Sequence, residues 1–109
     1  KSPNSYISKY SKISDGTIIM HHVIINASVT IGQNCIINNK SLIDHDTIIG
    51  DFNHISTGAI LNGGVNLGNN CFIGSGSVIN QDIVINNNCV VGSGLVVKKN
   101  IIKNIIIKK

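Results

Sequence analysis

The sequence contains no arginine, no glutamate and no tryptophan, and aromatic residues make up only 4% of its 109 residues. The lack of arginine, the scarcity of aromatic residues and the absence of a known binding motif argue against a nucleic-acid-binding role. No stretch reaches the roughly 18 consecutive apolar residues that a membrane-spanning helix needs, and no signal peptide opens the chain. We therefore expect a cytoplasmic protein without nucleic-acid or membrane partners.

Charge is also scarce, since Asp, Glu, Lys and Arg together make up 13% of the chain. A chain of this length has room for one domain with a core of modest size. Five of the nine lysines gather at the end of the chain: Lys98, Lys99, Lys103, Lys108 and Lys109. This cluster is consistent with contact to a phosphate-bearing ligand, but a solvated terminus is the favoured interpretation.

A six-residue repeat runs through the sequence. When the chain is cut into hexads from Tyr6, the second residue of every hexad is aliphatic, from Ile7 to Val97, without an insertion. The sixth residue is small or apolar in every hexad except the one that ends at Asn53. The third is mostly Gly, Asn or Ser, which we expect to form the tight turn between short strands. A period of six is not a multiple of 3.6, so the pattern excludes an α-helix.

The repeat predicts a parallel β-helix in which three hexads form one 18-residue coil with three flat faces. Sixteen hexads, over residues 6–101, make about five coils stacked roughly 4.8 Å apart. Residues 1–5 are then a lead-in, and residues 102–109 are a basic and apolar tail. Side chains 18 positions apart fall in one column, so the sequence predicts which of them are neighbours.

The three cysteines, Cys35, Cys71 and Cys89, occupy the sixth hexad position of one column, which also holds Asn53. We interpret them as small core residues of a protein in a reducing compartment. They lack CxxC spacing, and stacked side chains do not converge on one ion. We therefore expect neither a disulfide nor a metal site.

The first residue of each hexad should point outward, because its neighbour points inward. Two faces carry mostly apolar residues at this position: Tyr6, Ile24, Leu42, Ile60, Val78 and Val96 on one, and Ile18, Ile36, His54, Phe72 and Val90 on the other. Apolar strips of this size usually mark an interface, although β-branched residues also suit strands in general. We expect an oligomer that packs through these faces.

His45 is the best candidate for chemistry. Small residues, Ala27 and Gly63, lie below and above it in its column and leave a notch beside the imidazole. A neutral imidazole with an ordinary pKa of about 6.5 can accept a proton at physiological pH. A carboxylate on its other nitrogen would hold the tautomer and raise the basicity, and either Asp44 or Asp46 can supply it. The alternative is a surface histidine in a turn with incidental acids.

The segment LIDHDTIIGDFNHISTGAILNGGVNLGNNCFIGSGS, residues 42–77, resembles the core of bacterial sugar acyltransferases. That family includes sialic acid O-acetyltransferases and UDP-4-amino-sugar N-acetyltransferases. The resemblance covers nearly the whole chain from SYISKYSKISDGTIIM onward, and DHD followed nine residues later by the histidine of GDFNHIS is the family's own signature. It implies a left-handed β-helix, a homotrimer and acetyl-CoA as co-substrate, with no metal.

By this resemblance His45 is the general base and Asp46 the carboxylate that supports it. The remaining implied roles are contact with acetyl-CoA for His54, main-chain contact with the cofactor for Ser75 and Ser93, and proximity to the sugar for Asn38 and Gly63. The implied reaction is acetyl transfer to a sugar, with the amino group of a UDP-4-amino-sugar favoured. The alternatives are a sialic acid O-acetyltransferase-like enzyme and a non-catalytic trimeric β-helix module.

His45 and His54 should lie near different corners of the prism. One face spans about six residues at roughly 3.3 Å each, so the two imidazoles should be roughly 15–20 Å apart within one subunit. They can share a site only across a subunit boundary. We therefore expect His45 of one subunit to face His54 of its neighbour.

The chain departs from the family at both ends. Family members usually have an N-terminal Rossmann-like domain that helps to hold the sugar nucleotide, and a Gly-x-Pro-Ala turn where this chain has IKNIIIKK.

Two other functions are known for proteins of the same fold. A γ-carbonic anhydrase-type hydratase needs three convergent histidines, whose spacing His45 and His54 do not match. An ice-binding β-helix needs an aligned threonine ladder, which the sequence lacks. His21 and His22 are expected to be surface residues.

Overall fold

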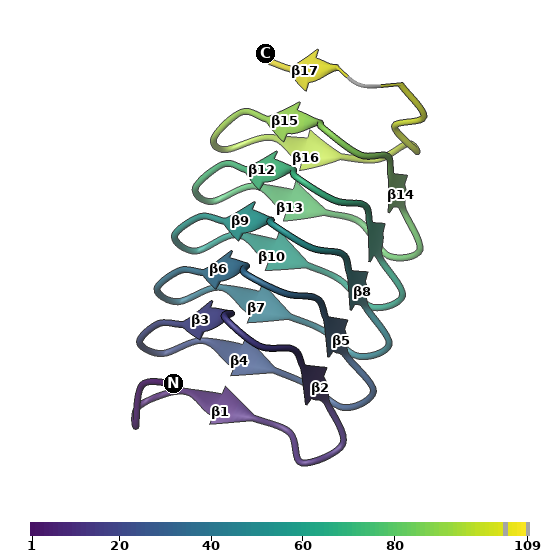
Figure 1. Cartoon of the computed structure of the whole chain (residues 1–109). Coiled ribbons are helices and arrows are strands. Elements are labelled where there is room, and N and C mark those ends of the chain that lie inside the picture. Colours follow the sequence, from purple (N-terminus) through teal and green to yellow (C-terminus); the bar gives the residue numbers. More distant parts are fainter. Residues whose placement is uncertain (104, 109) are drawn as a thin grey trace.

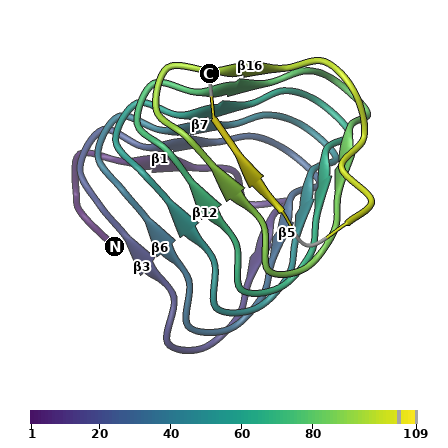
Figure 2. The same ribbon diagram turned by 90° about the horizontal axis from the view of Figure 1, so that it is seen from above.

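The computed structural model describes residues 1–103 and 105–108 as a stack of short β-strands joined by tight corners (Figure 1). Within these residues, seventeen two-residue strands wind around one axis. The coils form a triangle when seen along this axis (Figure 2). The chain is therefore the left-handed parallel β-helix that the repeat and the resemblance predict. The described segments contain no helix that could span a membrane.

Three parallel sheets form the three faces of the prism. The first sheet contains β1 (Tyr6–Ile7), β4 (Ile24–Ile25), β7 (Leu42–Ile43), β10 (Ile60–Leu61), β13 (Val78–Ile79) and β16 (Val96–Val97). The second contains β2 (Lys12–Ile13), β5 (Thr30–Ile31), β8 (Ile48–Ile49), β11 (Asn66–Leu67) and β14 (Val84–Ile85). The third contains β3 (Ile18–Ile19), β6 (Ile36–Ile37), β9 (His54–Ile55), β12 (Phe72–Ile73), β15 (Val90–Val91) and β17 (Ile106–Ile107). Up to β16, paired residues are 18 positions apart, so the coils stack in register.

The core is built from the second residue of each strand. These side chains are fully buried in the central coils, from Ile25 to Ile85. Because neighbouring residues of a strand point to opposite sides, the first residue of each strand faces outward. Large apolar side chains at this position are exposed, as the sequence predicts: Tyr6, Ile18, Ile24, Ile36, Ile48, Phe72, Val84 and Val96.

The left-handed backbone lies at the fifth hexad residue and not at the third, where we expected the tight turn. All fourteen fifth residues from Gly16 to Gly94 have a positive φ, nine of them non-glycine and five glycine. Glycine occurs at the third position for a different reason, which is the close approach of successive coils. A Cβ on Gly32 would lie 2.6 Å from the carbonyl oxygen of Gly50, and a Cβ on Gly50 would lie 2.8 Å from that of Gly68. These glycines allow successive coils to approach closely.

Polar side chains at the sixth hexad position are hydrogen-bonded inside the core. From Thr17 onward, each donates to a main-chain carbonyl fifteen residues ahead, at 2.6–3.1 Å: Thr17 to Gly32, Ser41 to Ser56, Thr47 to Asn62, Asn53 to Gly68 and Ser77 to Gly92. The thiols of Cys35 and Cys71 make the same type of contact. All three cysteines are free and buried, as predicted. Asn53 therefore makes the same type of hydrogen bond as Cys35 and Cys71 in its column.

Both ends of the chain join the stack. Ser2, in the expected lead-in, is buried, and its N–H donates to a carbonyl of β3. The expected tail, residues 102–109, supplies β17, which pairs with β15, so the β-helix continues beyond residue 101. Val90 pairs with Ile106, sixteen positions on, so the last coil is two residues shorter than the others. Figure 2 shows this segment crossing the C-terminal end of the prism; residues 104 and 109 lie outside the described residues.

Candidate active site

His45 and Asp46 lie at the corner between β7 and β8. Both side chains are exposed, by 62% and 67%. Imidazole Nδ1 is 3.0 Å from Oδ2 of Asp46, and this is the one ion pair found in residues 1–103 and 105–108. When Nδ1–H donates to this carboxylate, Nε2 carries the lone pair and can accept a proton.

Asp44 has other partners. Its Oδ1 accepts hydrogen bonds from Nδ2 of Asn26 at 2.9 Å and from the main-chain N–H of His45 at 2.8 Å. The hydrogen bond from Asn26, followed by that from His45, lowers the pKa of Asp44. The hydrogen bond with Asp46, followed by the charge of Asp44, raises the pKa of His45. Both acids therefore favour the protonated imidazole, but only Asp46 is hydrogen-bonded to its ring.

The imidazole of His45 lies over Gly63 of the next coil. A Cβ on Gly63 would be 2.6 Å from both Cε1 and Nε2 of His45, closer than real Cβ atoms approach. Any side chain at this position would therefore displace the ring. Gly63 is buried and has no positive φ, so its role in this corner is to provide space.

A hollow of about 710 Å³ adjoins His45 on the side of the N-terminal coils. Its walls come from three coils: Asp44 and His45 from one, Asn26 and Ala27 from the next, and residues 6–10 from the first. Sequence reasoning identified Ala27 as a small neighbour but missed Asn26 and the first coil. Asn26 lies 18 positions before Asp44, so the repeat itself predicts that the two are neighbours in one column. The depth of the hollow does not follow from the repeat.

His54 forms a second group, on the third sheet. Its ring packs edge-to-face against Phe72, with 5.1 Å between the ring centroids, and its Nε2 is 3.4 Å from Nδ2 of Asn38. Asn38 was expected near the sugar together with Gly63. Within one subunit, the structure places Asn38 beside His54 and Gly63 beside His45.

Ser75 and Ser93 lie one above the other at the corner that follows the third sheet. Both are exposed, and Oγ of Ser75 is 2.8 Å from Oγ of Ser56. Neither main-chain N–H makes a hydrogen bond within residues 1–103 and 105–108. At the corner between the second and third sheets, by contrast, side-chain oxygens accept from the corresponding N–H groups. The Ser75 corner therefore has free donors for the carbonyl or phosphate oxygens of an extended ligand.

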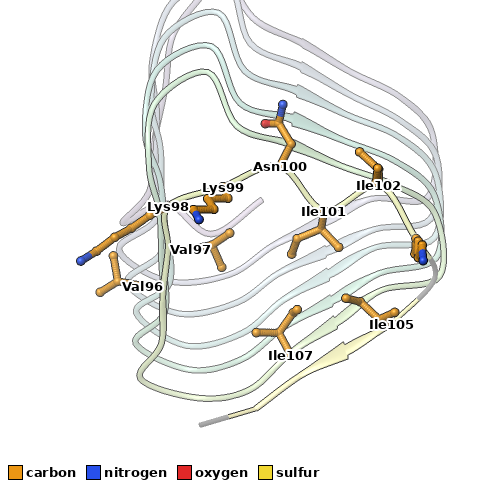
Figure 3. Close-up of a pocket in the computed structure, with 10 residues that line it drawn as sticks. Val96, Val97, Lys98, Lys99, Asn100, Ile101, Ile102, Ile105 and Ile107 are labelled. Carbon is orange, nitrogen blue, oxygen red and sulfur yellow. The ribbon is translucent and has the colours of Figure 1, made fainter.

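A hollow of about 420 Å³ lies at the C-terminal end, between the last coil and the tail (Figure 3). Val97, Ile101 and Ile107 face its interior, whereas Lys98 points away from it (Figure 3). None of the candidate site residues lines it. Within the described part of the chain, no group of three or more His, Cys, Asp or Glu side chains is arranged to hold a metal ion.

The sequence matches the family described as bacterial transferase hexapeptide (six repeats) over residues 10–45, 46–81 and 64–99. These matches cover most of the chain, which therefore belongs to this family of hexapeptide-repeat proteins.

Several solved structures have the same fold. The acetyltransferase domain of PglB from Neisseria gonorrhoeae FA1090 is 27% identical, with a TM-score of 0.93, and the match covers 95% of this chain and 51% of that one. The same domain in complex with acetyl coenzyme A has a TM-score of 0.94, at the same identity and coverage. A mutant of perosamine N-acetyltransferase from Caulobacter crescentus, in complex with CoA and GDP-perosamine, is 25% identical, with a TM-score of 0.74 and coverage of 95% and 48%. The present chain thus spans about half the length of these proteins.

Proposed function

We propose that this chain is the catalytic β-helix of an acetyl-CoA-dependent sugar acetyltransferase, with His45 as the general base. The observation that carries the proposal is the exposed imidazole of His45, which is bonded to Asp46 through Nδ1 and lies at the rim of a hollow. The similar PglB domain was solved with acetyl coenzyme A, and the similar perosamine N-acetyltransferase with a nucleotide sugar. Both support the proposed class of substrates.

The proposed reaction is direct transfer. Nε2 of His45 takes a proton from the acceptor amine as the amine nitrogen attacks the thioester carbonyl of acetyl-CoA. The new C–N bond forms, the C–S bond breaks, and CoA leaves as a thiolate that receives the proton from His45. Asp46 stabilises the imidazolium formed on the way, because its carboxylate accepts the Nδ1–H hydrogen bond.

The proposed acceptor is the amino group of a UDP-4-amino-sugar. A hydroxyl acceptor, as in sialic acid O-acetyltransferases, would use the same base. Parallel assays with amino and hydroxyl sugars distinguish the two, because only the favoured acceptor supports rapid CoA release.

The proposed acetyl-CoA site is the group around His54, together with the Ser75 and Ser93 corner. His54 and Asn38 offer polar atoms, Phe72 offers an aromatic edge, and the serine corner offers free N–H donors. Because His54 and His45 lie on different parts of the prism, we place the complete site between two subunits of a homotrimer. The outward apolar columns supply the surfaces for that assembly.

Replacement of His45 by alanine tests the proposal. We expect His45→Ala to lower turnover by roughly 10²–10⁴-fold, the usual contribution of a general base, without weakening acetyl-CoA binding. CoA release in the presence of a UDP-4-amino-sugar measures the first effect, and calorimetric titration with acetyl-CoA measures the second.

His22→Asn is the matched control, because His22 is an exposed corner histidine outside both groups. It should keep wild-type turnover. Full activity in His45→Ala would refute the role of His45. A wild-type protein that releases no CoA with any amino or hydroxyl sugar would refute the enzyme class.

A further inference from the structure

The hollow beside His45 extends along one corner of the prism to the first coil. Lys9, Ala27 and His45 are 18 residues apart and occupy one column on three successive coils. Ala27 ends at Cβ, so it leaves open the space between the two long side chains. Three stacked coils place the main chains of Lys9 and His45 roughly 10 Å apart. The volume of about 710 Å³ is typical of a site for a small molecule.

The far end of this hollow is cationic and aromatic. The ammonium of Lys9 lies 5.1 Å from the ring centroid of Tyr10, over the aromatic face. Tyr10 is exposed, and the N–H of Tyr10 donates to Oγ of Ser8 at 3.1 Å, which fixes the turn. Within residues 1–103 and 105–108, no carboxylate lies within salt-bridge distance of Lys9. Its charge is therefore available to an anionic ligand.

The near end is acidic. Asp44 and His45 line the same hollow, and Asp46 is bonded to His45. The hollow thus has acids at the catalytic end and a lysine at the other. A ligand with an amine at one end and an anion at the other matches this order of charges.

We propose that Lys9 and Tyr10 form the subsite for the phosphate-bearing end of the acceptor sugar. This inference rests on the proposed function, which places the acceptor amine at His45. A sugar ring then lies against Ala27, and a phosphate on its anomeric carbon reaches the ammonium of Lys9. Tyr10 holds that ammonium in place and presents the rest of its ring to the ligand. The same chemistry recognises a sugar 1-phosphate and a nucleotide sugar.

Lys9→Gln tests the subsite. We expect the KM for a UDP-4-amino-sugar to rise roughly tenfold with little change in kcat, because a charge-assisted hydrogen bond to phosphate is lost. The KM for the same sugar without phosphate should not change. Comparing the sugar 1-phosphate with the nucleotide sugar shows whether the nucleoside adds affinity. Tyr10→Phe should bind the phosphorylated acceptor normally, and Tyr10→Ala should bind it more weakly.

Lys99→Gln is the matched control, because Lys99 lies in the same column, three coils beyond His45. It removes the same charge without touching the hollow. Calorimetric titration with UDP gives a readout that does not depend on catalysis. Equal UDP affinity in the two variants would overturn the subsite even if the wild-type enzyme is active. Weaker UDP binding in Lys9→Gln alone would support it even if no acetyl transfer is found, in which case only the proposed function fails.

Discussion

At the scale of single residues, the proposed chemistry depends on the corner that holds His45 and Asp46. Asp46 has φ 61°, in the left-handed region like the other fifth hexad residues from Gly16 to Gly94, and this turn places its carboxylate beside the ring of His45. Asp44 contributes charge without touching the ring, because Asn26 and a main-chain N–H occupy its Oδ1. An exposed histidine thus gains basicity from its position in the repeat.

The pH dependence of activity should reveal the contribution of Asp46. His45 must be neutral to accept a proton, so kcat/KM of the wild type should fall on the acid side, around the raised pKa of His45. Asp46→Asn removes the main cause of that rise, so the acid limb should move to lower pH. The plateau should also drop by at least about tenfold, because an amide that donates to Nδ1 favours the tautomer with Nε2–H. Profiles of kcat/KM against pH test both effects.

Asp82→Asn is the control for this experiment, since Asp82 makes the smallest contribution among the groups that raise the pKa of His45. Its acid limb should stay close to that of the wild type. An unchanged limb in Asp46→Asn would show that the ion pair does not govern the catalytic histidine.

Gly63→Ala should separate activity from stability. The three atoms nearest to the new Cβ all belong to the imidazole of His45, an exposed side chain that can swing outward, so the fold should survive. Displacing the ring by about 1 Å is enough to lower turnover by roughly 100-fold. Gly50→Ala makes the opposite comparison, because its Cβ would press on the carbonyl of Gly68. Thermal unfolding should show a lower Tm for Gly50→Ala and a nearly unchanged Tm for Gly63→Ala. The reverse order would contradict the interpretation that Gly63 provides space for His45 and Gly50 allows the coils to approach.

At the scale of elements, main-chain hydrogen bonds link each two-residue strand to its neighbouring coils. The sixth hexad residues add bonds between coils, since Ser, Thr, Asn and Cys donate to the carbonyl of the coil ahead. Asn53 also accepts from the main-chain N–H of Cys71 at 2.7 Å. The polar residue in the core is therefore a link between coils.

Replacing Asn53 should reveal the energy of this link. Asn53→Leu removes both hydrogen bonds inside the core and leaves the N–H of Cys71 without an acceptor, so we expect a loss of about 2–4 kcal/mol in the free energy of unfolding. Asn53→Cys introduces the residue type of Cys35, Cys71 and Cys89 in the same column and should lose less. Urea unfolding at fixed protein concentration measures both. Equal stability of the Leu variant and the wild type would show that the side-chain hydrogen bonds of Asn53 do not stabilise the stack.

At the scale of the whole molecule, the prism presents outward apolar columns and two separate candidate sites, one around His45 and one around His54. The proposed trimer would cover the columns and bring His45 of one subunit to His54 of the next. The strand β17 adds a final parallel pairing at the C-terminal end and covers part of the open core there.

Mixing two inactive variants tests this arrangement. His45→Ala and His54→Ala subunits should each be inactive as homotrimers. After unfolding and refolding together in equal amounts, about a quarter of the sites should contain both native histidines, because each site draws one histidine from each of two randomly chosen subunits. Activity near a quarter of the wild-type level is the expected result. No recovery in verified mixed trimers, or a fully active monomeric wild type, would exclude a shared site.

Much of this protein follows from its sequence, because a solenoid turns sequence spacing into spatial contact. The hexad rhythm alone predicts the parallel β-helix, the inward and outward columns, the buried cysteines and the position of His45 between Ala27 and Gly63. These predictions hold because residues 18 apart have to stack when every coil has the same length.

The tertiary structure decided what does not repeat. It selected Asp46 over Asp44 as the partner of His45, because that choice depends on side-chain rotamers and on the hydrogen bond from Asn26. It placed Asn38 beside His54, joined β17 to the stack through a coil shortened by two residues, and opened the hollow toward Lys9. Each of these depends on corner geometry and side-chain direction, which a repeat of aliphatic residues leaves undetermined.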